Sequence, residues 1–523
     1  MKRILTIAIC LFACAITTFA QRGANNDWMT DNGDAQRTAN VKADAKINKD
    51  SVAKPGAVQF LWKLKLKNTP NQLNNLTAPA TLERLIGYRG FRMLGFIAGS
   101  GDNLFTIDTD LGRMEWERKL PTSGAAQAGT LACPGGMTTG VARPTTSMIA
   151  AVGGGFGPGR NTPAKSTVGT PWEGATTLAN VRPQQGPPPG PPPGAQQGPP
   201  RPSNAPPMGG GFGGLSVIYA LASDGMLHSM HLSNGQEYQP PVKFLPPGAN
   251  ASGLIIVNGK AFAVTAQSCN SVANGLWAYD FESKAMASWK GDVVGSAGAA
   301  FGGDGTAYVT TANGVTAIDP KTLQSKGSYT ASGQEFSSSP VVFEFKGKTL
   351  VAAATKTGSV HLLDAANLST ALATTPAGKE ASPSALSSWQ DASGTRWILA
   401  PTDNAVVAWK VVEQGGSLSL QSGWTSRALV SPLAPTIING VVFATSSGEF
   451  RTNDARVTAA QRAARSKPAV IYALDATTGK ELWNSGTTIK SFARGNALSG
   501  GMGQFYLTTF DGTFYAFGFP MEH

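Results

Sequence analysis

The sequence predicts an all-β protein: an eight-bladed β-propeller with four-stranded blades, closed by a strand from the N-terminal part of the chain. The first observation is a repeat, in which a short apolar strand leads eight times into a sharp polar turn. The second is composition, because the 523 residues include 62 glycines, 34 prolines and only 14% charged residues. Such a chain suits many short strands and turns and is poor material for helices.

The turn of the repeat has a signature that explains its geometry. In the two clearest copies glycine follows aspartate by four residues and tryptophan follows it by eight, at Asp108, Gly112 and Trp116 and at Asp475, Gly479 and Trp483. Aspartate bonds its own backbone two residues on, and glycine takes the positive φ that closes the turn. The tryptophan then begins the next apolar strand. We therefore predict that both tryptophans are buried between adjacent blades.

Eight anchor positions mark the copies, and their spacing sets the number of blades. They are Asp108, His231, Asp280, Asp319, Asp364, Lys410, Asp475 and Phe517. The intervals are 123, 49, 39, 45, 46, 65 and 42 residues, and five of the seven are close to the ~40–50 residues of a four-stranded blade. The last copy ends near Phe519 with no room for a fourth strand. We expect residues 60–66 to complete that blade and hide its edge.

These features resemble the repeat of the pyrroloquinoline-quinone-type β-propellers. The resemblance rests on the lead-in Tyr-Ala-Leu at residues 472–474 and the Asp-x-x-x-Gly-Lys-x-x-Trp turn that follows. Residues 27–38 are also similar to the start of these proteins. The superfamily contains the eight-bladed quinoprotein alcohol dehydrogenases and the outer-membrane assembly factor BamB. The resemblance implies the fold and not an activity, because the repeat is structural in both branches.

The chain divides into a signal peptide at 1–20, an N-terminal segment at 21–58 and a propeller at 59–523. Lys2 and Arg3 precede an apolar run, and Thr18-Phe19-Ala20 offers a small-residue cleavage site. We expect export to the periplasm or the medium. The alternative is lipid attachment at Cys14, which the apolar run beyond that residue argues against. No other stretch predicts a transmembrane helix.

Two insertions interrupt the repeat. Residues 121–214 include a stretch from Pro183 to Pro207 whose proline density favours polyproline II or disorder. We favour a surface loop, with a docking strip for an aromatic-lined groove as the alternative. Residues 449–468 are basic and predict one short helix between Asp454 and Arg465.

Charge and cysteine content bound the partners and the compartment. The formal net charge of +11 is modest for this length, and no dense Lys/Arg run indicates nucleic-acid binding. We attribute the charge to solubility rather than to attraction for anionic surfaces. After cleavage two cysteines remain, Cys133 and Cys269. They form either a disulfide, as an oxidising compartment favours, or two separate buried thiols.

The resemblance implies two possible functions. A quinoprotein dehydrogenase would use bound pyrroloquinoline quinone (PQQ), calcium and a carboxylate base, and that branch usually carries adjacent cysteines against the quinone. This chain has no Cys-Cys pair, no Cys-x-x-Cys-His haem motif and no common hydrolase or nucleotide motif. We therefore expect a non-catalytic scaffold, without a cofactor, that binds an envelope protein, glycan or other partner. The alternative is a PQQ-dependent oxidoreductase acting on an alcohol or sugar, its calcium held by scattered Asn, Asp and Glu.

Any ligand or partner should bind at the mouth of the central channel. Ser-Pro pairs precede several predicted inner strands, so side chains near them should ring the axis. The candidates are Ser338, Ser339, Ser382, Arg427, Ser431, Arg494 and Asn496. The competing interpretation is that the serine hydroxyls tie down backbone turns.

Overall fold

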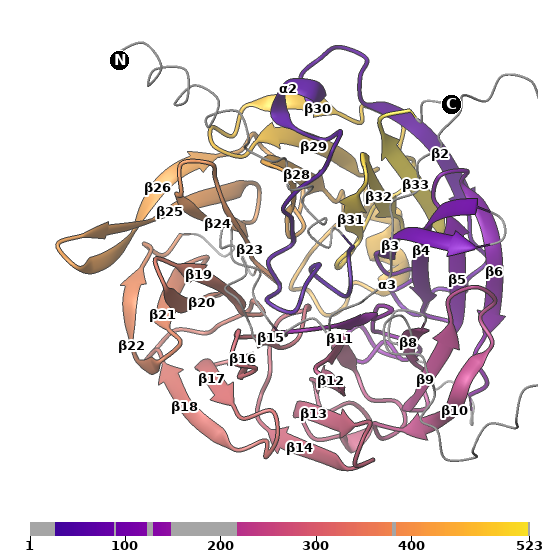
Figure 1. Ribbon diagram of the computed structural model, residues 1–523, viewed down its shortest axis with the longest axis horizontal. Coiled ribbons are helices and arrows are strands. Elements are labelled where there is room, and N and C mark those ends of the chain that lie inside the picture. The colour runs from indigo at the N-terminus through magenta and orange to yellow at the C-terminus, as the bar shows by residue number, and fades with distance from the viewer. Residues whose placement is uncertain (1–26, 88–89, 123–128, 148–216, 379–382, 521–523) are drawn as a thin grey trace, which may run out of the picture. The chain divides into compact units, whose positions relative to one another are not determined.

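A computed structural model describes residues 27–87, 90–122, 129–147, 217–378 and 383–520. Eight small antiparallel sheets are arranged as blades around one axis, which Figure 1 shows end-on. We number the blades 1 to 8 in chain order. Each begins with the strand nearest the axis and proceeds outward.

Blades 1 to 4 are formed by the chain between Ala80 and Thr330. Their strands are β3 (Ala80–Gly87), β4 (Gly90–Gly99), β5 (Asn103–Asp108) and β6 (Arg113–Lys119) in blade 1; β8 (Val217–Leu221), β9 (Met226–His231) and β10 (Glu237–Lys243) in blade 2; β11 (Ala251–Val257), β12 (Lys260–Thr265), β13 (Gly275–Asp280) and β14 (Met286–Lys290), with β7 (Pro144–Thr145), in blade 3; and β15 (Ala300–Phe301), β16 (Ala307–Thr311), β17 (Gly314–Ile318) and β18 (Ser325–Thr330) in blade 4. In blade 2 the innermost place is filled by Ala142, which bridges to Tyr219.

Blades 5 to 8 contain the rest. Their strands are β19 (Val341–Phe345), β20 (Lys348–Ala354), β21 (Val360–Asp364) and β22 (Asn367–Thr374) in blade 5; β23 (Ser387–Gln390), β24 (Arg396–Pro401), β25 (Val406–Gln414) and β26 (Ser417–Thr425) in blade 6; β27 (Thr436–Ile438), β28 (Val441–Ser446), β29 (Val470–Asp475) and β30 (Glu481–Asn484), with β1 (Asn40–Val41), in blade 7; and β31 (Leu498–Gly501), β32 (Gln504–Thr508) and β33 (Thr513–Gly518) in blade 8. The helices are short: α2 (Lys49–Val52), α3 (Ala459–Arg465) and the 3₁₀ turn η2 (Cys269–Ser271).

The ring is closed by a strand from the start of the chain, as the sequence predicts. Strand β2 (Gln59–Lys65) pairs antiparallel with β33, from Gln59 opposite Gly518 to Lys65 opposite Thr513. Blade 8 therefore combines both ends of the propeller. The pairing leaves β33 with a partner on each side and covers an edge that would otherwise be open.

A tryptophan on the outer strand joins three of the blades to the next blade. Trp116, at the outer strand of blade 1, is 7% exposed, and its Nε1 donates to the carbonyl oxygen of Leu232 in blade 2 at 2.8 Å. Leu232 directly follows the anchor position of that blade. Trp62 and Trp424 donate in the same way to the carbonyls of Thr109 and Ala476, each one residue after an anchor aspartate. The tryptophan therefore recognises the turn of the neighbouring blade.

The repeat glycine makes room for that tryptophan. Gly112, Gly235 and Gly479 all have positive φ, as the turn requires. A Cβ at Gly235 would also lie 2.5 Å from the ring of Trp116, and one at Gly479 would lie 2.6 Å from the ring of Trp424. The glycine is thus required twice, once for its own backbone and once for the interface between blades.

The second predicted tryptophan is less buried than expected. Trp483 is only half-buried, although its Nε1 donates to the Val58 carbonyl at 3.1 Å and its ring meets Phe505 and Phe517 of blade 8 edge-on. In the propeller, Trp483 faces the closing strand β2. This strand comes from outside the repeat and presents no Asp-x-x-x-Gly turn. Trp483 therefore lies between adjacent blades as predicted, but it is only half-buried because no repeat turn faces it where the propeller closes.

The double role of the repeat glycine predicts different losses of stability for two Gly→Ala substitutions. Gly235→Ala is expected to cost about 1–2 kcal/mol more stability than Gly347→Ala, because overpacking adds to backbone strain only at the first site. Gly347 has a similar positive φ of 79° but no atom within 4 Å of an added Cβ. Thermal or urea unfolding of both variants measures the difference. Equal costs would show that the glycine serves the turn alone.

The N-terminal segment crosses the centre of the ring (Figure 1) and bonds to all eight blades. Its backbone carbonyls and side chains between Asp27 and Asp44 meet the inner strands in turn, through Thr81, Arg143, Leu254, Phe301, Val342, Ser388, Ile437 and Gly503. Arg37 is fully buried in this segment and donates to the carbonyls of Ala299 and Gly253. The segment therefore locks the blades together where it crosses the axis.

Candidate functional site

A cavity of about 770 Å³ lies on the axis of the propeller. Every blade contributes to its wall, mostly through the turn that leads into the inner strand, at residues 74–77, 138–140, 250–252, 293–296, 335–337, 383–384, 432–433 and 494–496. Asp31 brings the N-terminal segment to the same cavity. The site is therefore built from eight repeats and from the segment that ties them together, which makes it rigid by construction.

The carboxyl group of Asp31 is deep and held by several partners. Burial raises its pKa, while Arg37, the backbone of Gly140 and Gly253, and the side chain of Asn496 oppose that rise. The amide of Asn496 is itself positioned by Ser296, whose hydroxyl donates to its Oδ1 at 3.2 Å. Asp31 is thus part of a fixed polar network and is not an isolated base.

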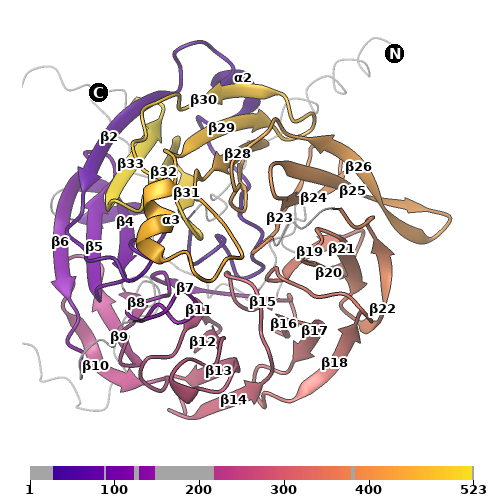
Figure 2. The same ribbon diagram turned by 180° about the vertical axis from the view of Figure 1, so that it is seen from behind.

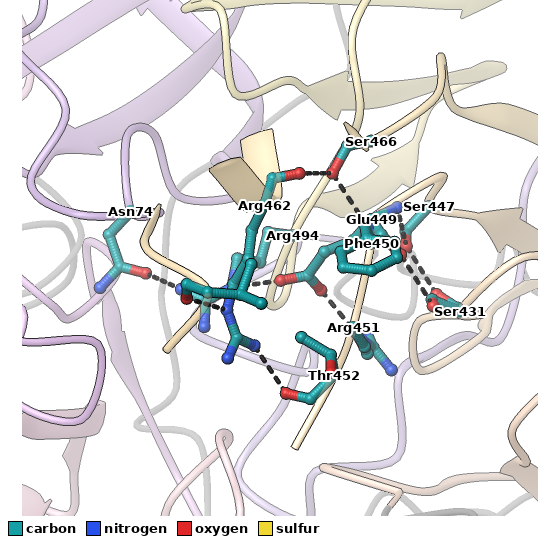
Figure 3. A network of polar contacts seen from close by, with 11 residues as sticks. Asn74, Ser431, Ser447, Glu449, Phe450, Arg451, Thr452, Arg462, Ser466 and Arg494 are labelled. Atoms are coloured by element: carbon teal, nitrogen blue, oxygen red, sulfur yellow. Dashed lines mark hydrogen bonds and ion pairs between the residues drawn. The ribbon is translucent and has the colours of Figure 1, made fainter. Parts of the chain in front are cut away.

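A second network surrounds Glu449 and is drawn in Figure 3. The side chain of Glu449 is 6% exposed, and each of its oxygens accepts from one arginine. Arg494 Nε donates to Oε1 at 2.7 Å and Arg451 Nε donates to Oε2 at 2.9 Å. Arg494 also donates from Nη1 to Asn74 Oδ1 at 2.7 Å, which links blade 8 to blade 1. The buried carboxylate therefore fixes two guanidinium groups at the wall of the cavity.

The basic insertion after β28 forms one side of this wall. Thr458 and Gln461 make a reciprocal capping box at the start of α3, and the helix lies within the predicted range. Figure 2 shows α3 on the face opposite to that of Figure 1, near the axis. Arg462 donates to three backbone carbonyls, those of Val457, Thr452 and Asp454, at 2.9–3.1 Å. Its role is to fold the loop, since each of its three nitrogens donates to the loop's own backbone.

A disulfide fastens the rim of the cavity. Cys133 and Cys269 are bonded, with their Cα atoms 5.6 Å apart and 136 residues between them in sequence. Leu131 and Gln267, two residues from each cysteine, line the cavity. The sequence left this pairing open, and the structure contains it. The bond holds the segment at 129–138 against blade 3.

Comparison with known proteins shows the fold. The quinohaemoprotein alcohol dehydrogenase of Comamonas testosteroni is 14% identical in sequence, with 96% of this chain and 82% of that chain covered at a TM-score of 0.56. A quinohaemoprotein alcohol dehydrogenase of Pseudomonas putida HK5 is 12% identical, with 95% and 81% covered at a TM-score of 0.56. This chain has the eight-bladed propeller fold of those proteins. BamB of Moraxella catarrhalis is 12% identical, with 90% and 99% covered at a TM-score of 0.48.

Sequence comparison adds no family to this result. No protein-family profile matches the chain, and no curated protein matches it. At 12–14% identity the likeness to the dehydrogenases establishes architecture alone.

The carboxylates of the cavity do not fit the calcium site that the quinoprotein resemblance implies. Calcium takes six to eight oxygen ligands, several of them carboxylate. Asp31 is engaged as described, Glu449 is held by two arginines, and Glu335 pairs with Lys356. Across the described part of the chain, no three His, Cys, Asp or Glu side chains group as a metal site.

Two of the predicted channel residues lie where we expected them. Arg494 and Asn496 line the cavity and belong to its two polar networks. The serines behave as the competing interpretation holds. Ser338 and Ser339 are buried and accept from the backbone N–H groups of Ala354 and Ala297. Ser431 donates to the Glu449 carbonyl at 2.9 Å.

The remaining two candidates differ in outcome. Arg427 lies away from the cavity, paired with Glu481 at 2.7 Å and stacked on the ring of Tyr472. It follows β26, the outer strand of blade 6, so the chain has not yet returned to the axis at this position. Its assignment to the channel mouth was wrong. Ser382, like residues 1–20 and Pro183–Pro207, falls outside the described residues.

Sequence reasoning missed four residues of the site: Asp31, Asn74, Glu449 and Arg451. Nothing in their local sequence distinguishes them. Only the ring brings blade 1, blade 8 and the N-terminal segment together.

Within the described part of the chain, the structure contains no helix with the length and apolar character that a membrane span requires.

Proposed function

We propose that this protein is an exported, non-catalytic scaffold whose axial cavity and surrounding loops bind a partner. The observation that carries the proposal is the state of the cavity carboxylates. Asp31, Glu335 and Glu449 each have cationic or N–H partners within the fold. A general base must be able to accept a proton from a substrate, and a metal ligand must offer lone pairs. Asp31 and Glu449 are instead used to hold the wall in shape, while Glu335 forms an exposed ion pair with Lys356.

The construction of the cavity supports a binding role. The N-terminal segment, the disulfide and the arginine pair on Glu449 all restrict motion of its wall. Preorganised walls lower the entropy lost on binding, because few side chains must be immobilised. The signal peptide expected at residues 1–20 would place this surface in the periplasm or outside the cell, where envelope proteins and glycans are available partners.

The alternative is a PQQ-dependent oxidoreductase, which the fold shared with two quinohaemoprotein alcohol dehydrogenases supports. That function would require a calcium site and a carboxylate base in the cavity. The acidic side chains there would have to leave their present partners to provide either one.

A spectroscopic titration separates the two functions. PQQ is added to the purified mature protein with and without calcium, and its absorbance is followed. We expect no change that depends on calcium, because the carboxylates are already paired. A stoichiometric spectral shift that requires calcium and is reversed by a chelator would support the oxidoreductase and reject the scaffold. A buffer without protein serves as the control.

A further inference from the structure

We propose that the axial cavity binds a small organic acid, whose carboxylate is recognised by Arg451 and Arg494. The inference names the ligand class for the binding role proposed above, and it rests on that role. It follows from the donors that the two arginines leave unused, from the charge of the cavity and from its size and lining.

The two arginines have N–H groups to spare. A guanidinium group carries five N–H donors. Arg451 uses its Nε on Glu449, and Arg494 uses Nε on Glu449 and Nη1 on Asn74. The remaining donors of both residues have no acceptor among the described residues. Their side chains are 45% and 34% exposed and line the cavity, so these donors can reach a ligand.

Glu449 orients the pair for this purpose. Because each arginine is held at Nε by a different oxygen of one buried carboxylate, the two guanidinium groups are fixed beside Glu449, one on either side of its carboxyl group (Figure 3). Planar guanidinium groups bind carboxylates with two parallel N–H···O bonds, which gives both affinity and orientation. An entering carboxylate would meet donors that are already in place.

The charge of the cavity favours an anion. Its described lining holds four basic and three acidic side chains. With one more basic than acidic group, the formal net charge of this lining is positive. Arg451 comes from the basic insertion, outside the four-stranded repeat, and this chain therefore adds a cation to a site that the repeat alone would not supply.

The size and lining of the cavity indicate an organic ligand. A volume of about 770 Å³ lies within the roughly 300–1,000 Å³ typical of small-molecule sites and far exceeds the space that an inorganic anion fills. Apolar side chains share the wall with the arginines, among them Leu433 and Phe510. A ligand with one carboxylate end and an apolar body satisfies both parts of the wall.

Isothermal titration calorimetry of the full mature protein tests the proposal. The four probes are benzoate, phthalate, the uncharged analogue benzamide, and inorganic phosphate. We expect the two carboxylates to bind with dissociation constants below about 10 mM and benzamide to bind at least about tenfold more weakly. Binding should weaken as salt is raised. Equal binding of benzamide, or no binding of either carboxylate, would overturn the proposal. Phosphate binding as tight as phthalate would assign the arginines to an inorganic anion and overturn the organic class.

Variants locate the site. Arg451→Gln should weaken carboxylate binding by about tenfold, and Arg451→Lys by less, because it keeps the charge and loses the planar fork. Arg456→Gln is the matched control, since Arg456 belongs to the same insertion but is 90% exposed, paired with Asp454 and absent from the cavity lining. The melting temperature of each variant confirms folding. Unchanged affinity in a folded Arg451→Gln variant would place the ligand elsewhere.

The outcome is independent of the test for oxidoreductase activity. If no carboxylate binds and PQQ shows no calcium-dependent shift, the ligand class is wrong and the scaffold remains. If benzoate and phthalate bind and PQQ also shows the calcium-dependent shift, the scaffold is rejected and the ligand class stands, because PQQ is itself an organic acid.

Discussion

Replacing Arg37 by methionine is expected to destabilise the protein by about 3–5 kcal/mol, the usual cost of removing one partner from a buried charged network. Arg37 is fully buried, and its guanidinium donates to the carbonyls of Ala299, Gly253 and Asp31 and to the hydroxyl of Thr30 at 2.6–3.0 Å. Methionine fills much of the volume but leaves four acceptors without a donor.

Urea or thermal unfolding of the variant measures this effect. Arg113→Met is the control, because Arg113 is 59% exposed and its contacts with the buried Asp108 and Glu115 are long, at 3.7 and 3.5 Å. That substitution should cost less than about 1 kcal/mol. Similar costs for the two variants would mean that the N-terminal segment is attached to the ring without locking it.

Replacing Trp116 by alanine is expected to cost about 3–5 kcal/mol, the range for a buried aromatic side chain. The ring packs on Gly235 of the next blade and its Nε1 is bonded to the Leu232 carbonyl, so the variant loses a contact between blades and leaves a cavity. Trp483→Ala should cost less, about 1–3 kcal/mol, because that ring is half-buried. Chemical unfolding of both variants gives the comparison. A larger cost at Trp483 would contradict the interface described here.

The fold could be predicted from the sequence because the same strand-and-turn signature occurs in several copies along the chain. Asp475 Oδ1 accepts from the backbone N–H groups of Thr477 and Thr478, the turn that its position predicts. The helix after residue 454 and the closing strand at residues 60–66 also lie in their predicted ranges. The turn and the helix are local properties, fixed by residues near one another in the chain, whereas the closing strand was inferred from the missing fourth strand of the last copy.

The site could be predicted only in part, because its geometry is not local. Arg494 and Asn496 lie beside an inner strand and were found through the repeat. Glu449 is the first residue of the basic insertion, and nothing nearby indicates that Arg494, forty-five residues later, will pair with it. Arg427 shows the opposite case. It is close to a Ser-Pro pair in sequence, yet the chain there is still at the outer edge of blade 6.

The N-terminal segment is a further example of a role that depends on the assembled ring. Its residues 27–38 carry the resemblance to the quinoprotein-type propellers, and the structure shows a structural role for that stretch. It contacts the inner strands of successive blades and carries the buried Arg37. A stretch that resembles an enzyme family is therefore accounted for here by assembly of the ring.

The most direct test of the scaffold is turnover. The purified mature protein is assayed with PQQ, calcium and an artificial electron acceptor, over a panel of alcohols and aldose sugars. We expect no substrate-dependent reduction of the dye above the rate without protein, because the acidic side chains of the cavity are held by Arg451, Arg494, Lys356 and Asn496. Turnover that requires the quinone and disappears with a chelator would contradict this account and make the protein a dehydrogenase.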